Sequence, residues 1–176
     1  LAIVNVVGST IAKLADDVIY TWAGPEIAVA TTKGYTTQVA VLDMLAVYLA
    51  RRLGRIDEAR YRELVGAIES FPALVQRAID LNPNLEALAE KYHSHQDVFF
   101  IGRNLDSATC LEGSLKLKEI AYIHAEAYAA GELKHGPISL IEEGTMVVAV
   151  ATNGHLFDKT MSNVKETKAR GAMVLG

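Results

Sequence analysis

Three apolar runs without a regular alternation of polar residues constrain the fold of this chain more than any other feature. The runs are LAIVNVV at 1–7, DVFFI at 97–101 and TMVVAVA at 145–151. A strand with one face in water alternates apolar and polar residues, whereas a strand of a parallel sheet is buried on both faces. Each run is followed by a glycine-containing turn and then by a segment of helical pattern. The sequence therefore predicts an α/β fold with doubly wound parallel sheets.

Further elements repeat the order of strand and helix. A strand is expected at 17–22, and a long helix at 32–53 follows it. A second helix is expected over 109–124, where TCLEGSLKLKEIAYIH has helical periodicity, and a third over 155–170. Ser9 is a suitable N-cap for a short helix after the first strand.

The middle of the chain has a helical pattern without strands. A helix over 57–81 is expected to be interrupted at Phe71-Pro72, because proline cannot donate a hydrogen bond to the helical ladder. Asn82-Pro83-Asn84 then begins a helix that covers 85–93. A helical span between strand–helix units is typical of a connector between two α/β lobes.

These patterns divide the chain into three parts. We expect residues 1–54 to form the C-terminal part of a first lobe, 55–95 a helical connector, and 96–176 the N-terminal part of a second lobe. The chain opens inside a strand and ends at GAMVLG, where a new strand begins. A parallel sheet needs partner strands and covering helices, so we expect this sequence to be a fragment.

Composition excludes several classes of protein. The net charge is −4 and the basic residues are scattered, which argues against a nucleic-acid-binding surface. The single cysteine, Cys110, excludes a disulfide framework and suits a reducing cytoplasm; we expect it to be an inert buried thiol. The longest apolar helical run, 39–50, is too short to cross a bilayer and contains Asp43. No nucleotide-binding glycine motif occurs, and no cofactor is expected.

Glu112, Lys116 and Glu119 share one face of the helix predicted over 109–124, because residues three or four apart are neighbours on a helix. Two carboxylates and an amine, followed by a glycine-bracketed turn that presents His135, supply candidates for a general acid and a general base. The alternative is a salt-bridged helix face with a turn histidine.

Two other groups of residues are candidates for binding sites. Residues 22–33 follow a predicted strand, and Thr31 and Thr32 there could bind a phosphate or sugar hydroxyl, or could simply cap the next helix. His93 and His95 could bind a metal with His124, but no cysteine or acidic residue stands at ligand spacing. We favour a solvated helix end for these histidines and expect no metal.

Two longer segments carry a resemblance to a known family. The run LEGSLKLKEIAYIHAEAYAAGELKHGPISLIEEG closely resembles the isomerase domain of glucosamine-6-phosphate synthase, the isomerizing glutamine:fructose-6-phosphate amidotransferase, which has the sugar-isomerase (SIS) fold. GPEIAVATTKGYTTQ at 24–38 resembles the threonine–lysine segment in the first lobe of the same domain. The two matches occur in the family's order and at about its separation, and the resemblance covers essentially the whole chain.

The resemblance implies a reaction and a role for each matching residue. The family makes glucosamine 6-phosphate from fructose 6-phosphate and ammonia derived from glutamine. Glu119 matches the carboxylate that moves a proton between C1 and C2, Lys116 the lysine that orients it, and Glu112 would hold Lys116 in position. His135 matches the histidine that opens the cyclic sugar and reaches the site from the neighbouring subunit of a homodimer.

The resemblance also implies a phosphate site and missing parts. The backbone of Val29 and the side chain of Thr31 would lie beside the sugar phosphate. The family's glutaminase domain, its phosphate-binding loop before residue 1 and its C-terminal tail are not in this sequence, so the fragment alone should be inactive.

Two other functions remain open. One is a sugar-phosphate isomerase or deaminase of the same fold that has no glutaminase domain. The other is a non-catalytic regulator that binds sugar phosphates, which should lack the carboxylate at the proton-transfer position. The presence of Glu119 counts against the regulator.

Overall fold

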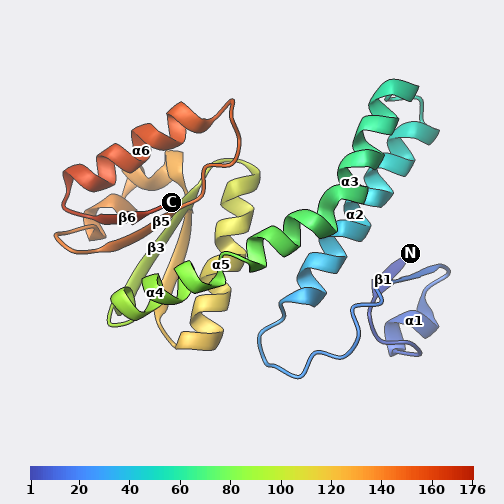
Figure 1. Cartoon of the computed structure of the whole chain (residues 1–176), viewed down its shortest axis with the longest axis horizontal. Helices are drawn as coiled ribbons and strands as arrows, with labels where there is room; N and C mark the ends of the chain where they lie inside the picture. Colours follow the sequence, from blue (N-terminus) through green and yellow to red (C-terminus); the bar gives the residue numbers. More distant parts are fainter. The chain divides into compact units, whose positions relative to one another are not determined.

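Parallel strand pairing occurs near both ends of the chain in the computed structural model, which describes residues 1–176 (Figure 1). The chain divides into two compact units, Leu1–Leu88 and Ala89–Gly176. No helix has the length and apolar composition that a membrane crossing requires.

The first unit begins with a small strand–helix–strand arrangement. β1 (Ala2–Val4) and β2 (Val18–Tyr20) pair in parallel and are connected through α1 (Thr10–Leu14). The Ser9 hydroxyl accepts a hydrogen bond from the amide of Ala12 at 3.3 Å, which confirms Ser9 as the N-cap. Both strands are shorter than the apolar patterns predicted.

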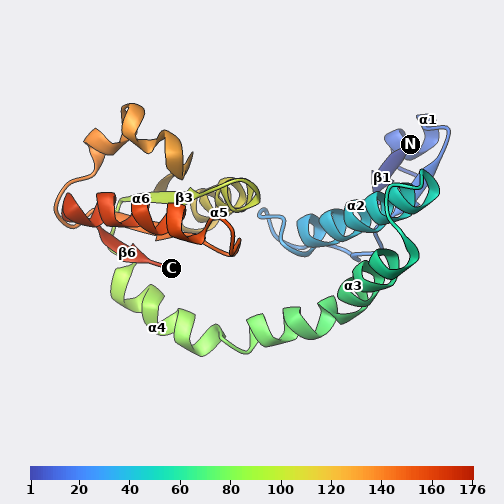
Figure 2. The same ribbon diagram turned by 90° about the horizontal axis from the view of Figure 1, so that it is seen from above.

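Two long helices complete most of this unit. α2 (Lys33–Arg52) and α3 (Glu58–Ile79) lie side by side (Figures 1 and 2). Arg51 and Glu58 form an ion pair across the turn between them. The Asp57 carboxylate accepts a hydrogen bond from the Arg60 amide at 2.8 Å, so α3 begins with a side-chain cap.

The expected interruption at Phe71-Pro72 is wrong, because α3 continues through Pro72. Proline there leaves the carbonyl oxygen of Ile68 without its helical donor. Phe71 and Pro72 are exposed, so water can reach this turn, and the long flanking segments keep the helix together. α4 (Asn82–Tyr92) begins at Asn82, three residues before the predicted start, since proline is tolerated in a first turn.

The second unit contains a parallel sheet of four strands in the order β4-β3-β5-β6. The strands are β3 (Asp97–Gly102), β4 (His124–Ala129), β5 (Met146–Ala149) and β6 (Met173–Leu175). The connecting elements are α5 (Leu105–Ala121), the 3₁₀ helices η1 (Ala130–His135) and η2 (Pro137–Leu140), and α6 (Phe157–Ala169). The predicted α/β fold with parallel strands is confirmed.

Successive residues of β3 face two separate cores. Phe99 and Ile101 pack with Leu133 of η1 and Val164 of α6. Val98 packs with Ala125 and Met146 in the second core, to which Leu117 of α5 contributes. Helical segments therefore cover both faces of the sheet, as double winding requires.

Strand β4 is absent from the predicted elements, which extend the helix to His124. α5 instead ends at Ala121, and the next residue, Tyr122, adopts a left-handed conformation with φ 57°. Glycine is the usual signal for such a helix end, and this turn has none. The strand that follows pairs along its whole length with β3, a long-range contact that a local pattern does not report.

The carboxyl end of β3 is packed closely against the start of α5. A Cβ atom on Gly102 would lie 2.6 Å from the carbonyl carbon and 2.7 Å from the carbonyl oxygen of Asp106. The Asp106 side chain, which is 5% exposed, accepts hydrogen bonds from the Thr152 amide at 2.9 Å and the Thr152 hydroxyl at 2.5 Å. These contacts join the loops that follow β3 and β5.

Cys110 lies in the same helix and is fully buried. Burial raises the pKa of its thiol to about 11, since the thiolate is disfavoured away from water. The prediction that this thiol is buried is confirmed, and its raised pKa agrees with the expected inertness.

The close approach at Gly102 gives a test of the fold. Gly102→Ala should lower the free energy of unfolding by about 1–3 kcal/mol, because the new methyl group meets backbone atoms that cannot move aside. Gly66→Ala in α3 is the matched control: its Cβ meets open space, so helix propensity should raise stability by up to about 1 kcal/mol. Urea unfolding measures both. Equal effects of the two substitutions would contradict the packing described for Gly102.

Candidate active site

The three charged residues predicted to share a face of α5 do lie together. The Lys116 ammonium is 2.5 Å from a carboxylate oxygen of Glu119 and 3.4 Å from one of Glu112. The three side chains are 19–28% exposed, so they are neither free in solvent nor fully buried. The helical spacing i, i+4 and i, i+3 is enough to produce this arrangement.

Glu112, Lys116 and Glu119 form a charged column along α5. This column lies on the side of the helix that is turned away from the sheet. Asp106, Cys110 and Ser114 are the buried positions of this helix, and Leu117 packs into the core beside Val98. The column lies about half a helical turn from these positions. A substrate or another polypeptide segment could therefore reach it without disturbing the sheet.

The column holds a positive charge between two negative ones. The hydrogen bond to Glu119 is the main cause that raises the pKa of Lys116, and the Glu112 carboxylate adds to it, while burial acts in the opposite direction. Lys116 therefore stays protonated at neutral pH. The arrangement provides a carboxylate oriented by a charged donor, which is suited to proton transfer.

His135 is not brought to the column. It is the last residue of η1, it is exposed, and Gly136 follows it with φ 150°. Leu133 anchors η1 in the core on the α6 side of the sheet, whereas α5 covers the other side. Within the second unit, η1 is thus anchored on the α6 side of the sheet, whereas Glu119 belongs to α5 on the other side.

The segment that contains Val29 and Thr31 lies between β2 and α2 in the first unit, and both residues are exposed. The alternative that Thr31 or Thr32 caps α2 is wrong. The Glu26 carboxylate accepts hydrogen bonds from the amides of Thr32 at 2.9 Å and Gly34 at 3.1 Å, and the Thr32 side chain makes no capping bond.

Glu26 is a site residue that sequence reasoning missed. Its capping partners are six and eight positions away, and the usual capping patterns have shorter spacing. The Gly34 and Thr32 amides, with help from the Thr31 side chain and Lys33, lower the pKa of Glu26, while burial acts in the opposite direction. A Cβ on Gly34 would lie 2.7 Å from a Glu26 oxygen, so glycine there lets the carboxylate approach.

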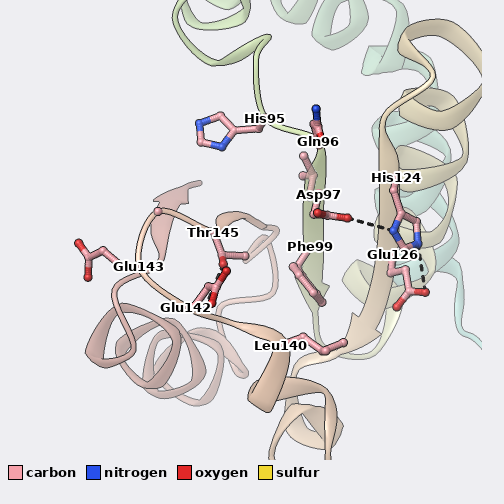
Figure 3. Close-up of a pocket in the computed structure, with 12 residues that line it drawn as sticks. His95, Gln96, Asp97, Phe99, His124, Glu126, Leu140, Glu142, Glu143 and Thr145 are labelled. Carbon is pink, nitrogen blue, oxygen red and sulfur yellow. Dashed lines mark hydrogen bonds and ion pairs between the residues drawn. The ribbon is translucent and has the colours of Figure 1, made fainter.

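A cavity of about 420 Å³ opens in the second unit at the amino ends of β3, β4 and β5, the end of the sheet opposite to Gly102 (Figure 3). In it the two ring nitrogens of His124 lie 3.1 Å from Asp97 and 3.5 Å from Glu126. His95 lies across the cavity from His124, and no cluster of histidine, cysteine or acidic residues in the structure could hold a metal ion. None of the candidate catalytic residues lines this cavity.

A family model described as the SIS domain matches residues 1–48 and 91–176. The chain belongs to the SIS domain family. The model leaves residues 49–90 unmatched, and this interval contains all of α3. The division into two partial lobes and a connector at 1–54, 55–95 and 96–176 stays a prediction.

Two curated relatives of this SIS domain chain carry the same protein name. It is 57% identical to glutamine–fructose-6-phosphate aminotransferase (isomerizing) of Symbiobacterium thermophilum and 54% identical to the protein of the same name in Clostridium tetani, each over 176 residues. The solved C-terminal domain of glucosamine-fructose-6-phosphate aminotransferase from Francisella tularensis superposes with a TM-score of 0.94 at 38% identity.

The resemblance described from the sequence is confirmed by these matches. The match covers 100% of this chain but 29% of each of the two curated relatives. It covers 97% of this chain and 48% of the Francisella domain. The SIS domain chain therefore spans less than a third of the curated proteins that it matches.

The Glu26 cap predicts a pH-dependent contribution to stability. A carboxylate with a lowered pKa stabilises the fold above its unfolded pKa, and this stabilisation is lost as pH falls through the folded pKa. Glu26→Gln should therefore lower the midpoint of thermal unfolding at pH 7, and the difference from the unsubstituted protein should disappear in strong acid.

Thr32→Val is the matched control for this cap, because the Thr32 side chain makes no capping bond. It should leave the midpoint at pH 7 nearly unchanged. A larger effect for Thr32→Val than for Glu26→Gln would mean that Thr32, and not Glu26, caps α2.

Proposed function

We propose that this chain is part of the isomerase domain of a glutamine–fructose-6-phosphate aminotransferase. That enzyme makes glucosamine 6-phosphate from fructose 6-phosphate and ammonia derived from glutamine. The observation that carries the proposal is the ion-paired column of Glu112, Lys116 and Glu119, formed in a chain that matches proteins of this name along its whole length. The glutaminase-free isomerase or deaminase and the regulator have no comparable support.

Glu119 is the proposed proton carrier. Ammonia replaces the C2 carbonyl oxygen of the open sugar as an imine, and water leaves. The Glu119 carboxylate then takes a proton from C1, and the electron pair of the C1–H bond moves toward the imine. The imine nitrogen takes up a proton as this enaminol forms. The same carboxyl group then returns a proton to C2 while the C1 hydroxyl gives up its proton, which leaves an aldehyde at C1 and an amine at C2.

Lys116 and Glu112 support this carboxylate. The 2.5 Å contact with Lys116 fixes one oxygen of Glu119 and leaves the other for the substrate. Glu112 holds the other side of the same ammonium. Lys116 can also donate to a sugar hydroxyl when substrate is bound, since an ammonium has three donors.

His135 is the proposed residue that opens the cyclic sugar, in the site of a neighbouring subunit. Leu133 and Lys134, the residues just before His135, contact the α6 side of the sheet, whereas the column lies on α5 on the other side, and this supports the arrangement. A homodimer in which each subunit lends His135 to the other would satisfy the geometry.

The segment between β2 and α2 is the proposed binding site for the phosphate of the sugar. The Val29 backbone and Thr31 would hold the sugar phosphate, and Glu26 already caps the adjacent helix, which leaves Thr31 unneeded as a cap. The full-length protein would carry a glutaminase domain and work in the cytoplasm. No nucleic acid, membrane, metal or cofactor is part of the proposal.

Replacement of Glu119 tests the mechanism. Glu119→Gln in the full-length protein keeps the size of the side chain but cannot accept a proton, so synthesis of glucosamine 6-phosphate should fall by roughly 10²–10⁴-fold. Glutamine hydrolysis and thermal stability should change little. The rate of product formation under substrate saturation is the measurement.

Glu63→Gln is the matched control for the loss of a helical ion pair. Glu63 pairs with Arg60 at 2.7 Å with i, i+3 spacing, as Lys116 and Glu119 do, but on the exposed surface of α3. It should leave synthesis unchanged. Near-normal synthesis by Glu119→Gln would make the column a salt bridge without a catalytic role.

Replacement of Thr31 tests the phosphate site. Thr31→Val keeps the shape but removes the hydroxyl, so it should weaken binding of fructose 6-phosphate by about 1–2 kcal/mol. Thr36→Val, in the first turn of α2, is the control and should not change affinity. Isothermal titration measures both affinities. Unchanged affinity for Thr31→Val would show that the Thr31 hydroxyl does not bind the phosphate.

A further inference from the structure

Four polar side chains connect η1 to the carboxyl end of β3 through α6. The Arg103 guanidinium, just after β3, donates two hydrogen bonds to the Asn163 amide oxygen, at 2.9 and 3.1 Å. The Asn163 amide nitrogen donates to Glu166 at 3.1 Å. The other Glu166 oxygen lies 2.7 Å from the ammonium of Lys134, the residue before His135.

The centre of this network is buried, and its direction is fixed. Asn163 is 3% exposed, so an unpaired amide there would be costly. Arginine can only donate and an ionised carboxylate can only accept, so the amide has one satisfactory orientation. The Lys134 ammonium lowers the pKa of Glu166 more than any other group does, and the pair therefore stays ionised at neutral pH.

The same network lies against the backbone of η1. A Cβ atom on Gly131 would lie 3.1–3.4 Å from atoms of the Arg103 guanidinium, so the start of η1 passes directly over that group. Leu133 is fully buried between these two ends. η1 is thus held by Arg103 at its first turn, by Leu133 in its middle and by Lys134 near its end.

His135 comes immediately after the last of these attachments. On its other side, the Gly136 carbonyl accepts bonds from the Ser139 amide at 2.9 Å and the Ser139 hydroxyl at 2.7 Å. The His135 side chain itself is exposed, and none of the side-chain hydrogen bonds in the structure involves it. Its orientation therefore depends on the backbone that carries it.

We propose that Lys134, Glu166 and Asn163 are positioning residues that fix η1 so that His135 points in one direction. The inference rests on the proposed function, in which His135 opens the cyclic sugar of a neighbouring subunit. Positioning of a catalytic group matters strongly, since a misplacement of about 1 Å can cost roughly 10²-fold in rate. The network should therefore affect ring opening and leave proton transfer on α5 unchanged.

Two substrates separate these steps. Fructose 6-phosphate closes its ring through the 5-hydroxyl, whereas 5-deoxyfructose 6-phosphate lacks that hydroxyl and stays open. In the full-length protein, Lys134→Met should lower the rate with fructose 6-phosphate by roughly 10- to 100-fold and leave the rate with the 5-deoxy compound unchanged. Lys134→Arg should restore most of the rate, because it keeps a cation beside Glu166.

Lys165→Met is the matched control, since Lys165 is an exposed lysine of α6 outside the network. It should change neither rate. Asn163→Leu should reproduce the selective loss, provided that circular dichroism shows a folded protein. Lys134 is 58% exposed, so Lys134→Met keeps the test valid if Asn163→Leu does not fold.

The outcomes distinguish the inference from the proposed function. Equal losses with both substrates, or no loss for Lys134→Met while His135→Asn loses activity with fructose 6-phosphate only, would overturn the positioning role. Full activity of His135→Asn with both substrates would overturn the proposed role of His135 itself.

Discussion

The absence of a side chain at Gly102 is the constraint on which the second unit depends. Because the carboxyl end of β3 has no Cβ there, the first turn of α5 can lie against the strand. That contact sets where α5 begins, and Asp106 then ties the turn to Thr152 after β5. The start and packing of α5 decide which of its residues meet the sheet. Glu112, Lys116 and Glu119 point away from the sheet as a result.

Charge in this molecule is arranged in short paired groups. Lys116 lies between two carboxylates, and the Asn163 amide joins Arg103 to Glu166. Every buried polar side-chain atom has a hydrogen-bond partner. Partly buried groups that are paired in this way keep one geometry, which is what proton transfer and the presentation of an exposed side chain both require.

Local patterns were sufficient to predict much of the fold and the column of α5. Continuous apolar runs marked β1, β3 and β5, and helical spacing placed Glu112, Lys116 and Glu119 together. The errors came from features that local patterns do not carry. The helix end at Tyr122 lacks glycine, so β4 was missed, and Glu26 caps α2 from outside the usual window. The Arg103–Asn163 bond joins residues 60 positions apart, and no spacing rule reports it.

Side chains alternate along β3, so neighbouring residues pack against different helical segments on the two faces of the sheet. Phe99 stacks on Tyr128 with ring centroids 6.0 Å apart, in the core beneath η1. Phe100 lies toward α5, where a Cβ on Gly113 would come within 3.0 Å of its ring. Under the proposed function, η1 serves one subunit's substrate and α5 serves the other's. A substitution at Phe99 would then disturb the packing beneath η1 and so the neighbouring subunit's site, whereas a substitution at Phe100 would disturb α5 and the site of its own subunit.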